Sequence, residues 1–148
     1  MRDFVSSWMF IATWDRMAFY GAKITSIMNS FQVVMVTDGR FSFAIFNYGD
    51  INWTTGTDNG GDANTGLGGT PAQVGFNAGD GVTFYSVPGS QTAAIVDIET
   101  TSNIGVPGRW VFRTDNSNIE GLECTTSGAF TTFTILALAD AINLTRGY

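Results

Sequence analysis

The stretch Phe41-Ser-Phe-Ala-Ile-Phe-Asn-Tyr-Gly-Asp-Ile-Asn-Trp-Thr-Thr-Gly56 combines strand-like alternation, several aromatic residues and a glycine at its end. Residues 31–37 and 40–48 flank Asp38-Gly39, and Asp-Gly between alternating apolar runs is a strong signal for a two-residue hairpin turn, since both turn positions need a positive φ. Neither face of the second run is plainly polar, so we expect both faces to be covered, as in a β-sandwich or a sheet capped by loops. Residues 51–54 are predicted to continue as a strand.

Further strand signals lie on both sides of this hairpin. Residues 8–14 are short, apolar and aromatic, which predicts a buried strand. Residues 72–76 and 82–87 predict a second hairpin. Residues 109–114 predict a strand with one buried aromatic face. The secondary structure of two segments is left undecided. Residues 92–98 fit the helical period and the strand period equally well. The tail from residue 127 is predicted to form either a strand and then a short helix or no settled structure.

The composition favours one mainly β domain. A chain of 148 residues can bury about two thirds of its unfolded surface in a single core. Hydrophobic residues make up 44% and charged residues only 14%, so long solvent-facing helices should be scarce. The predicted fold class is therefore mainly β: an antiparallel β-sandwich or meander with long loops rich in Gly, Asn and Asp, and at most one or two short helices.

Charge and hydropathy exclude several classes of partner. The formal net charge is −6, and the seven basic residues are scattered, so the chain lacks the basic cluster of a nucleic-acid-binding protein. Attraction to an anionic membrane surface is equally unexpected. The longest apolar tract, residues 133–142, is far shorter than the ~20 residues that cross a bilayer, so no membrane insertion is expected.

Several motifs carry a resemblance to a known family. They are the stretch from Phe41, Ala12-Thr-Trp-Asp15, Ser30-Phe-Gln-Val-Val-Met-Val-Thr-Asp-Gly39, Gly66-Leu-Gly-Gly-Thr-Pro-Ala-Gln-Val-Gly-Phe-Asn-Ala-Gly-Asp-Gly81, Val87-Pro-Gly-Ser90 and Ser102-Asn-Ile-Gly-Val-Pro-Gly-Arg-Trp-Val-Phe-Arg113. Together they resemble the nidogen-like (NIDO) domain from about Trp8 to Asp115. The expected organisation is an N-terminal extension (1–7), the nidogen-like domain (8–115) and a C-terminal tail or the start of a linker to a further module (116–148).

The resemblance implies a non-enzymatic module of a secreted protein that serves cell-matrix adhesion or matrix assembly. Its expected partners are extracellular matrix or cell-surface proteins. The resemblance also implies an extracellular location. Because the start of the chain has no apolar run that suits a signal peptide, we expect the signal to lie further upstream in a longer protein. Loops held on a rigid sheet are the expected contact surface, and residues 55–70 form the longest of them.

The residues themselves limit the available chemistry. The chain has no His, which removes the usual general base of Ser and Cys hydrolases and the commonest transition-metal ligand. Paired carboxylates still permit a glycan hydrolase, with Asp50, Asp80, Asp97 and Glu99 as candidates. Asp50 and Asp80, however, lie beside glycines, where Asp ordinarily accepts backbone hydrogen bonds in a turn.

One cluster of oxygen donors suits a hard cation. Asp58, Asn59, Asp62 and Asn64 lie together on the Gly-rich loop, and calcium prefers such ligands. The alternatives are a calcium- or carbohydrate-binding β-sandwich module, or a solvated loop of ordinary turn-forming residues that needs no cofactor.

Three further residues suit a secreted protein. Cys124 is the only cysteine, and in the family context it is expected to form a disulfide with a neighbouring module or another chain. Asn52 and Asn143 each begin a glycosylation sequon. Asn52 is expected to point away from the core, opposite to both of its neighbours.

Overall fold

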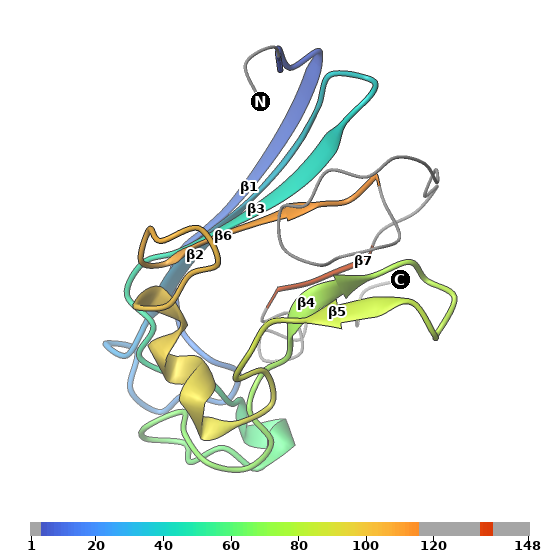
Figure 1. Ribbon diagram of the computed structural model, residues 1–148. Coiled ribbons are helices and arrows are strands. Elements are labelled where there is room, and N and C mark those ends of the chain that lie inside the picture. The colour runs from blue at the N-terminus through green and yellow to red at the C-terminus, as the bar shows by residue number, and fades with distance from the viewer. Residues whose placement is uncertain (1–3, 116–133, 138–148) are drawn as a thin grey trace, which may run out of the picture.

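The computed structural model describes residues 4–115 and 134–137, which form two antiparallel β-sheets and two short 3-10 helices (Figure 1). The predicted mainly β fold class is confirmed. In chain order the elements are β1 (Trp8–Met17), β2 (Asn29–Thr37), β3 (Ser42–Tyr48), η1 (Thr57–Asn59), β4 (Val74–Asn77), β5 (Phe84–Ser86), η2 (Ala93–Glu99), β6 (Arg109–Arg113) and β7 (Thr134–Ala137).

The larger sheet has the strand order β1-β2-β3-β6, and its centre is the predicted β2–β3 hairpin. The prediction of a two-residue turn in this hairpin was wrong. Thr37 pairs with Ser42, so the loop comprises residues 38–41. Within this loop only Gly39 has a positive φ. The Asp38 carboxylate accepts hydrogen bonds from the backbone N–H groups of Phe41 (2.6 Å) and Arg40 (2.8 Å). These bonds stabilise the wider loop, because they satisfy amides that the strand ladder does not reach.

The smaller sheet has the order β5-β4-β7. Its β4–β5 hairpin confirms the second predicted hairpin, although both strands are shorter than expected and pair only from Gly75↔Ser86 to Asn77↔Phe84. Strand β7 pairs with the other edge of β4. The strand alternative for the tail is thus realised at residues 134–137.

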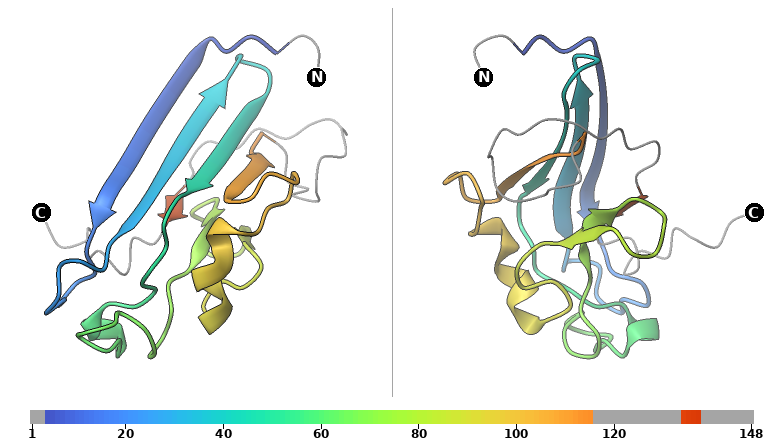
Figure 2. Two further views of the ribbon diagram at one scale, coloured as in Figure 1. Left: turned by 90° about the vertical axis from the view of Figure 1, so that its left-hand side faces the viewer. Right: turned by 45° about the vertical axis from the view of Figure 1, so that its right-hand side comes forward.

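The core lies between the two sheets (Figures 1 and 2). Phe112 of β6 stands at its centre, with ring centroids 5.6 Å from Phe46, 5.3 Å from Phe76 and 4.9 Å from Tyr85. Trp110 is also buried, so β6 has the expected aromatic face. The period-2 alternation of the strands therefore places their aromatic residues where the sheets meet.

Strand β1 departs from its prediction as a buried strand. Trp8, Met9, Phe10 and Ile11 are each about half exposed, between 48% and 54%. The reason is position: β1 is the edge of the larger sheet, so its side chains have neighbours on one side only (Figure 2). A strand's apolar composition does not reveal whether it lies at the centre or the edge of a sheet.

The outer face of the larger sheet is only partly covered. Phe43 is buried, and its ring packs against the Phe4 ring in a T-shaped arrangement with a centroid distance of 5.3 Å. Ile45 and Asn47 on the same face of β3 stay half-buried. The expectation that both faces of this strand are covered is therefore met at one end of it.

The segment left open at residues 92–98 is a 3-10 helix, η2. Thr92 begins it, since its side-chain hydroxyl accepts a hydrogen bond from the Ala94 N–H. Ile95 and Ile98 are buried, and the spacing of three brings both onto one face of a 3-10 helix.

Several sequence predictions lie outside the described residues: the disulfide of Cys124, the sequon at Asn143, the short helix of the tail, and the tail or linker at 116–148 apart from residues 134–137. Within residues 4–115 and 134–137, no helix has the length and apolar character needed to span a bilayer.

Candidate functional site

Two loops that are far apart in the sequence join at the end of the molecule opposite the β2–β3 hairpin (Figure 1). Residues 18–28 follow β1 and residues 55–70 surround η1, and we call them together the paired-loop surface. The Lys23 N–H donates to the Ala63 carbonyl (2.9 Å), and the Thr57 N–H and hydroxyl both donate to the Tyr20 carbonyl (3.0 and 3.3 Å). The predicted contact loop 55–70 is therefore one half of a double-loop structure.

The paired-loop surface rests on a buried aromatic pair. Phe19 and Trp53 are almost fully buried, with ring centroids 6.0 Å apart. The Trp53 indole N–H donates to the Met17 carbonyl at 2.8 Å. Gly66 has a φ of +65° and passes so close that a Cβ there would lie 2.6 Å from both the Phe19 ring and the Trp53 Cβ. Only glycine fits this position without moving its neighbours.

Asn29 supports the segment that leads into the longer loop. Residues 51–54 form no strand, which corrects the strand predicted there. The buried Asn29 side chain takes the place of a partner strand: its Oδ1 accepts from the N–H groups of Asn52 (2.7 Å) and Trp53 (3.1 Å), and its Nδ2 donates to the Trp53 carbonyl (2.8 Å). Sequence reasoning missed Asn29, because nothing local marks a side chain that bonds residues more than twenty positions away.

The longer loop is folded by its own hydrogen bonds. Asp62 Oδ1 accepts from the N–H groups of Asn64 (2.9 Å) and Thr65 (3.0 Å). These bonds, with smaller contributions from the Thr65 hydroxyl and the charge of Lys23, lower the pKa of Asp62. The turns of this loop are thus stabilised by hydrogen bonds from backbone N–H groups to the Asp62 side chain.

The four predicted calcium ligands are distributed unevenly over this loop. Asp58 and Asn59 lie in η1, Asp62 and Asn64 follow it, and all four are exposed. One oxygen of Asp62 is committed to the turn. In the described parts of the chain, no three carboxylate or thiol side chains gather as a metal-ligand group. Calcium binding by Asp58, Asn59, Asp62 and Asn64 stays a prediction.

Apolar side chains also reach solvent from the paired-loop surface. Tyr20, Ile24 and Leu67 are exposed to between 42% and 46%. They come from both loops and stand among the exposed polar residues Lys23 and Asp58. Exposed apolar groups on a rigid backbone, surrounded by polar groups, suit contact with another protein.

The candidate carboxylates of a glycan hydrolase occupy three separate elements. Asp80 lies in the β4–β5 loop, where it accepts hydrogen bonds from the Thr83 hydroxyl and from the N–H groups of Thr83 and Val82; these lower its pKa to about 2. Glu99 on η2 accepts from the Ile51 N–H. Asp97 also lies on η2, and Asp50 follows β3. The turn role expected for Asp80 is confirmed, whereas no side-chain bond of this kind is observed for Asp50.

Asn52, the first residue of one sequon, is exposed between the buried Ile51 and Trp53, which confirms its expected direction. Its Nδ2, the atom that glycosylation would modify, donates to the Met28 carbonyl at 2.8 Å. Glycosylation of Asn52 itself stays a prediction.

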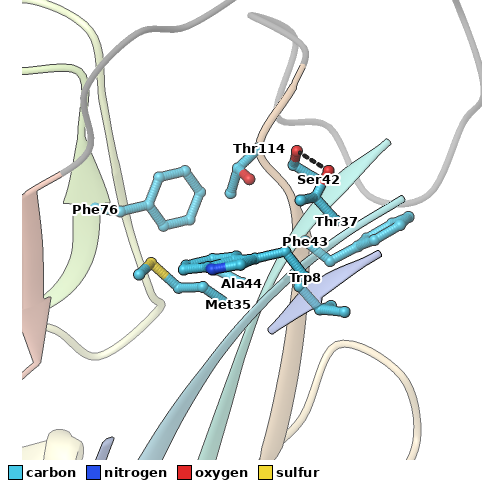
Figure 3. A pocket seen from close by; sticks show the side chains of 9 residues that line it. Trp8, Met35, Thr37, Ser42, Phe43, Ala44, Phe76 and Thr114 are labelled. Atoms are coloured by element: carbon cyan, nitrogen blue, oxygen red, sulfur yellow. Dashed lines mark hydrogen bonds between the residues drawn. The ribbon is translucent and has the colours of Figure 1, made fainter. Parts of the chain in front are cut away.

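A pocket lies near the other end of the larger sheet, beside the β2–β3 hairpin. It is a cavity of about 160 Å³ lined mainly by apolar groups, among them Met35, Ala44 and Phe76 (Figure 3). The hydroxyls of Ser42 and Thr37 at its side bond each other at 3.1 Å. The lining contains no ionisable side chain. The cavity therefore suits an apolar group about the size of a benzene ring and offers no acid or base that could activate the Ser42 and Thr37 hydroxyls.

Comparison with known proteins extends these observations. The family model of the nidogen-like domain matches residues 1–116. Alpha-tectorin of Mus musculus is 50% identical over 131 residues, which is 88% of this chain and 6% of that protein. Protein mesh of Bombyx mori is 44% identical over 74% of this chain, and nidogen of Drosophila melanogaster is 34% identical over 74%; the aligned parts are 7% and 8% of those proteins. No solved structure matches.

Proposed function

Because this chain belongs to the nidogen-like domain family, we propose that it is a non-enzymatic module for cell-matrix adhesion or matrix assembly that contacts other proteins through the paired-loop surface. The family supports the role of an extracellular matrix module. The chain spans only 6% to 8% of the length of the relatives described above. The proposal therefore concerns this module and not a whole protein.

The observation that carries the proposal is the set of hydrogen bonds and buried aromatic contacts that hold the paired-loop surface. Loop 55–70 is braced by its own turns, by the shorter loop through Lys23 and Thr57, and by Phe19 and Trp53 beneath it. A braced loop loses little conformational entropy on binding, so its exposed groups favour association more than those of a loose loop would. Tyr20, Ile24 and Leu67 supply the apolar part of such a contact.

Two features argue against a catalytic role for the paired-loop surface. The chain lacks His, and the four candidate carboxylates Asp50, Asp80, Asp97 and Glu99 all lie outside this surface. A contact surface accounts for the exposed apolar side chains, which a carboxylate hydrolase would leave unexplained.

The expected partners are extracellular matrix or cell-surface proteins, and the expected location is outside the cell. Nucleic acid is not an expected partner, because the net charge of −6 comes without a basic cluster. Membrane insertion is not expected either, because the longest apolar tract, residues 133–142, is far shorter than the ~20 residues that cross a bilayer. A disulfide through Cys124 to a neighbouring module or chain belongs to the same proposal.

The test is a pull-down from extracellular-matrix extract with the purified chain, with and without calcium. Replacing all of loop 55–70 would remove the contacts of buried Thr55 and Gly66, so point substitutions of exposed residues are the better probe. The triple variant Tyr20→Ser, Ile24→Ser and Leu67→Ser should lose the captured protein. The variant Val82→Ser should keep it, since Val82 is 78% exposed but lies in the β4–β5 loop.

Urea unfolding of each variant establishes that the chain is still folded. Capture that survives in the folded triple variant would refute the paired-loop surface as the binding site. A chain that captures no matrix protein would refute the adhesive role.

A further inference from the structure

Three dipeptides in the described part of the chain join Asn or Asp to glycine: Asp38-Gly39, Asn59-Gly60 and Asp80-Gly81. Such pairs are open to a slow covalent reaction, in which the backbone nitrogen of the glycine attacks the side-chain carbonyl carbon of the residue before it. Glycine favours this reaction because it has no Cβ to obstruct the approach and the widest choice of backbone conformations. The surroundings of the three pairs decide which of them can react.

The two aspartates are protected by their turns. Hydrogen bonds from the Phe41 and Arg40 N–H groups lower the pKa of Asp38. Those from the Thr83 hydroxyl and N–H lower the pKa of Asp80 to about 2. Both side chains are therefore ionised at neutral pH and bonded in place, and a carboxylate that keeps its negative charge is a poor target for a nucleophile.

Asn59 has no comparable protection. It is the last residue of η1, at the end of the molecule opposite the β2–β3 hairpin (Figure 1), and it is exposed. Its side-chain amide makes no hydrogen bond to any described residue. Most of the other described asparagines have bonded side chains; Asn103, for example, bonds both the N–H and the carbonyl of Val111 at the outer edge of β6. The amide of Asn59 is thus neutral, unbonded and followed by glycine.

We propose that Asn59 is a site of spontaneous deamidation in the folded chain. The Gly60 backbone nitrogen loses its proton and bonds to Asn59 Cγ, the Cγ–Nδ2 bond breaks, and the departing nitrogen takes up a proton and leaves as ammonia. Water from the solvent then opens the resulting succinimide ring at either of its two carbonyls. One product has an aspartate at position 59, and the other has an isoaspartate, in which the backbone runs through the Cβ.

The fold restrains the attacking nitrogen only weakly. Among the described residues, Gly60 N–H donates one hydrogen bond, to the Thr57 carbonyl at 3.0 Å. This bond closes a 3-10 turn, whose hydrogen-bond geometry is poorer than that of an α-helix. A single exposed turn opens locally at a much lower cost than the whole domain unfolds. The bonds from Asp62 to its own turn do not have to break, so the reaction is slow but does not need unfolding.

Deamidation changes the paired-loop surface in two ways. It adds a negative charge beside the exposed Asp58. The isoaspartate also adds one carbon to the backbone before Gly60, where the chain passes close to Gly69: a Cβ on Gly60 would lie 3.5 Å from the Gly69 Cα. If this surface contacts a matrix protein, and this step rests on that proposed function, the aged chain should bind its partner more weakly.

The test is incubation of the full chain for several weeks at mildly alkaline pH and body temperature. Chymotrypsin cleavage after Trp53 and Leu67 gives one peptide that contains both Asn59 and Asn64, and fragmentation in the mass spectrometer assigns the modified position. Asn64 is the internal control, because it is exposed in the same loop and has no side-chain hydrogen bond but precedes Thr65. Deamidation at Asn59 should be faster by about tenfold or more, which a difference of ~1.4 kcal/mol in the barrier produces.

Variants separate the site from its surroundings. Asn59→Gln should remove the signal, since its longer side chain would have to close a larger ring, whereas Asn64→Gln should leave the signal unchanged. Urea unfolding establishes that both variants are folded. No deamidation of the folded chain, equal rates at Asn59 and Asn64, or a reaction seen only in urea would each overturn the proposal.

The effect on binding is measured separately with the matrix pull-down. Weaker capture by the aged chain, absent from the aged Asn59→Gln variant, would support the effect on the paired-loop surface, and unchanged capture would overturn that effect. The mass measurement needs no partner, so its failure leaves the proposed function standing, and failure of the fresh chain to capture a protein leaves the modification site standing.

Discussion

Gly66 allows a sharp test of how the paired-loop surface is built. Its φ of +65° is one that other residues adopt at a cost, and a Cβ there would lie 2.6 Å from the Trp53 Cβ and from the Phe19 ring. Its carbonyl also accepts hydrogen bonds from the N–H groups of Thr54 and Thr55, both at 2.9 Å. The position therefore combines an unusual backbone conformation with close packing.

The substitution Gly66→Ala adds two separate costs. The left-handed conformation costs about 1–2 kcal/mol for a residue with a Cβ. Forcing a methyl group into a packed core costs a further ~1–3 kcal/mol. Gly66→Ala should therefore lower the free energy of unfolding by about 2–5 kcal/mol, a large share of the ~5–15 kcal/mol that holds a typical domain together.

Gly68→Ala is the matched control, because Gly68 lies in the same loop with a φ of +84° and nothing within 4 Å of an added Cβ. It should cost only the conformational part, about 1–2 kcal/mol. The assay is urea unfolding of both variants, followed by tryptophan fluorescence and analysed by linear extrapolation. Equal losses in the two variants would refute the packing of Gly66 against Phe19 and Trp53.

Three further predictions follow from individual residues. Asn29→Ala leaves buried backbone groups of Trp53 without a partner and should lower the free energy of unfolding by about 3 kcal/mol in urea titrations; a loss below about 1 kcal/mol would contradict its bracing role. The pKa of Asp80 is lowered from 3.8 to about 2, so its contribution to stability is present above pH 3.8 and is lost as the pH falls towards 2. The urea midpoint of Asp80→Asn should therefore depend less on pH over this range, and an unchanged dependence would argue against its turn bonds. If Asp58, Asn59, Asp62 and Asn64 bind calcium, added calcium should raise the thermal midpoint and Asp58→Asn should abolish the rise, whereas an unchanged midpoint would leave the loop a purely hydrogen-bonded structure.

Local patterns predicted much of the strand content. The hairpin around Asp38-Gly39, the hairpin after residue 72 and the aromatic strand that became β6 were all recognisable, because alternation and turn residues act over a few neighbouring positions. The loop length at Asp38 was not recognisable. It depends on how the Asp38 carboxylate bonds the amides of Arg40 and Phe41 once the strands have paired.

The candidate site was less accessible to sequence reasoning. The loop 55–70 stood out by its composition, but its partner loop did not. Contacts such as Lys23 to Ala63 and Thr57 to Tyr20 join residues about forty positions apart, and no local pattern encodes them. The same limit applied to residues 51–54, which were predicted to be a strand, whereas the side chain of Asn29 supplies hydrogen bonds to Asn52 and Trp53 in place of a partner strand.

The sequence by itself determined the mainly β class, the two hairpins and the resemblance to the nidogen-like family, because these depend on residue order and spacing alone. Only the tertiary structure decided that β1 is an exposed edge, that Asn103 closes the opposite edge at β6, and that two distant loops form one surface. The physical reason is that burial and hydrogen-bond satisfaction are properties of what lies next to a residue in space. For Trp8 and Ile11 the decisive fact is that, in the described structure, no strand lies beyond them.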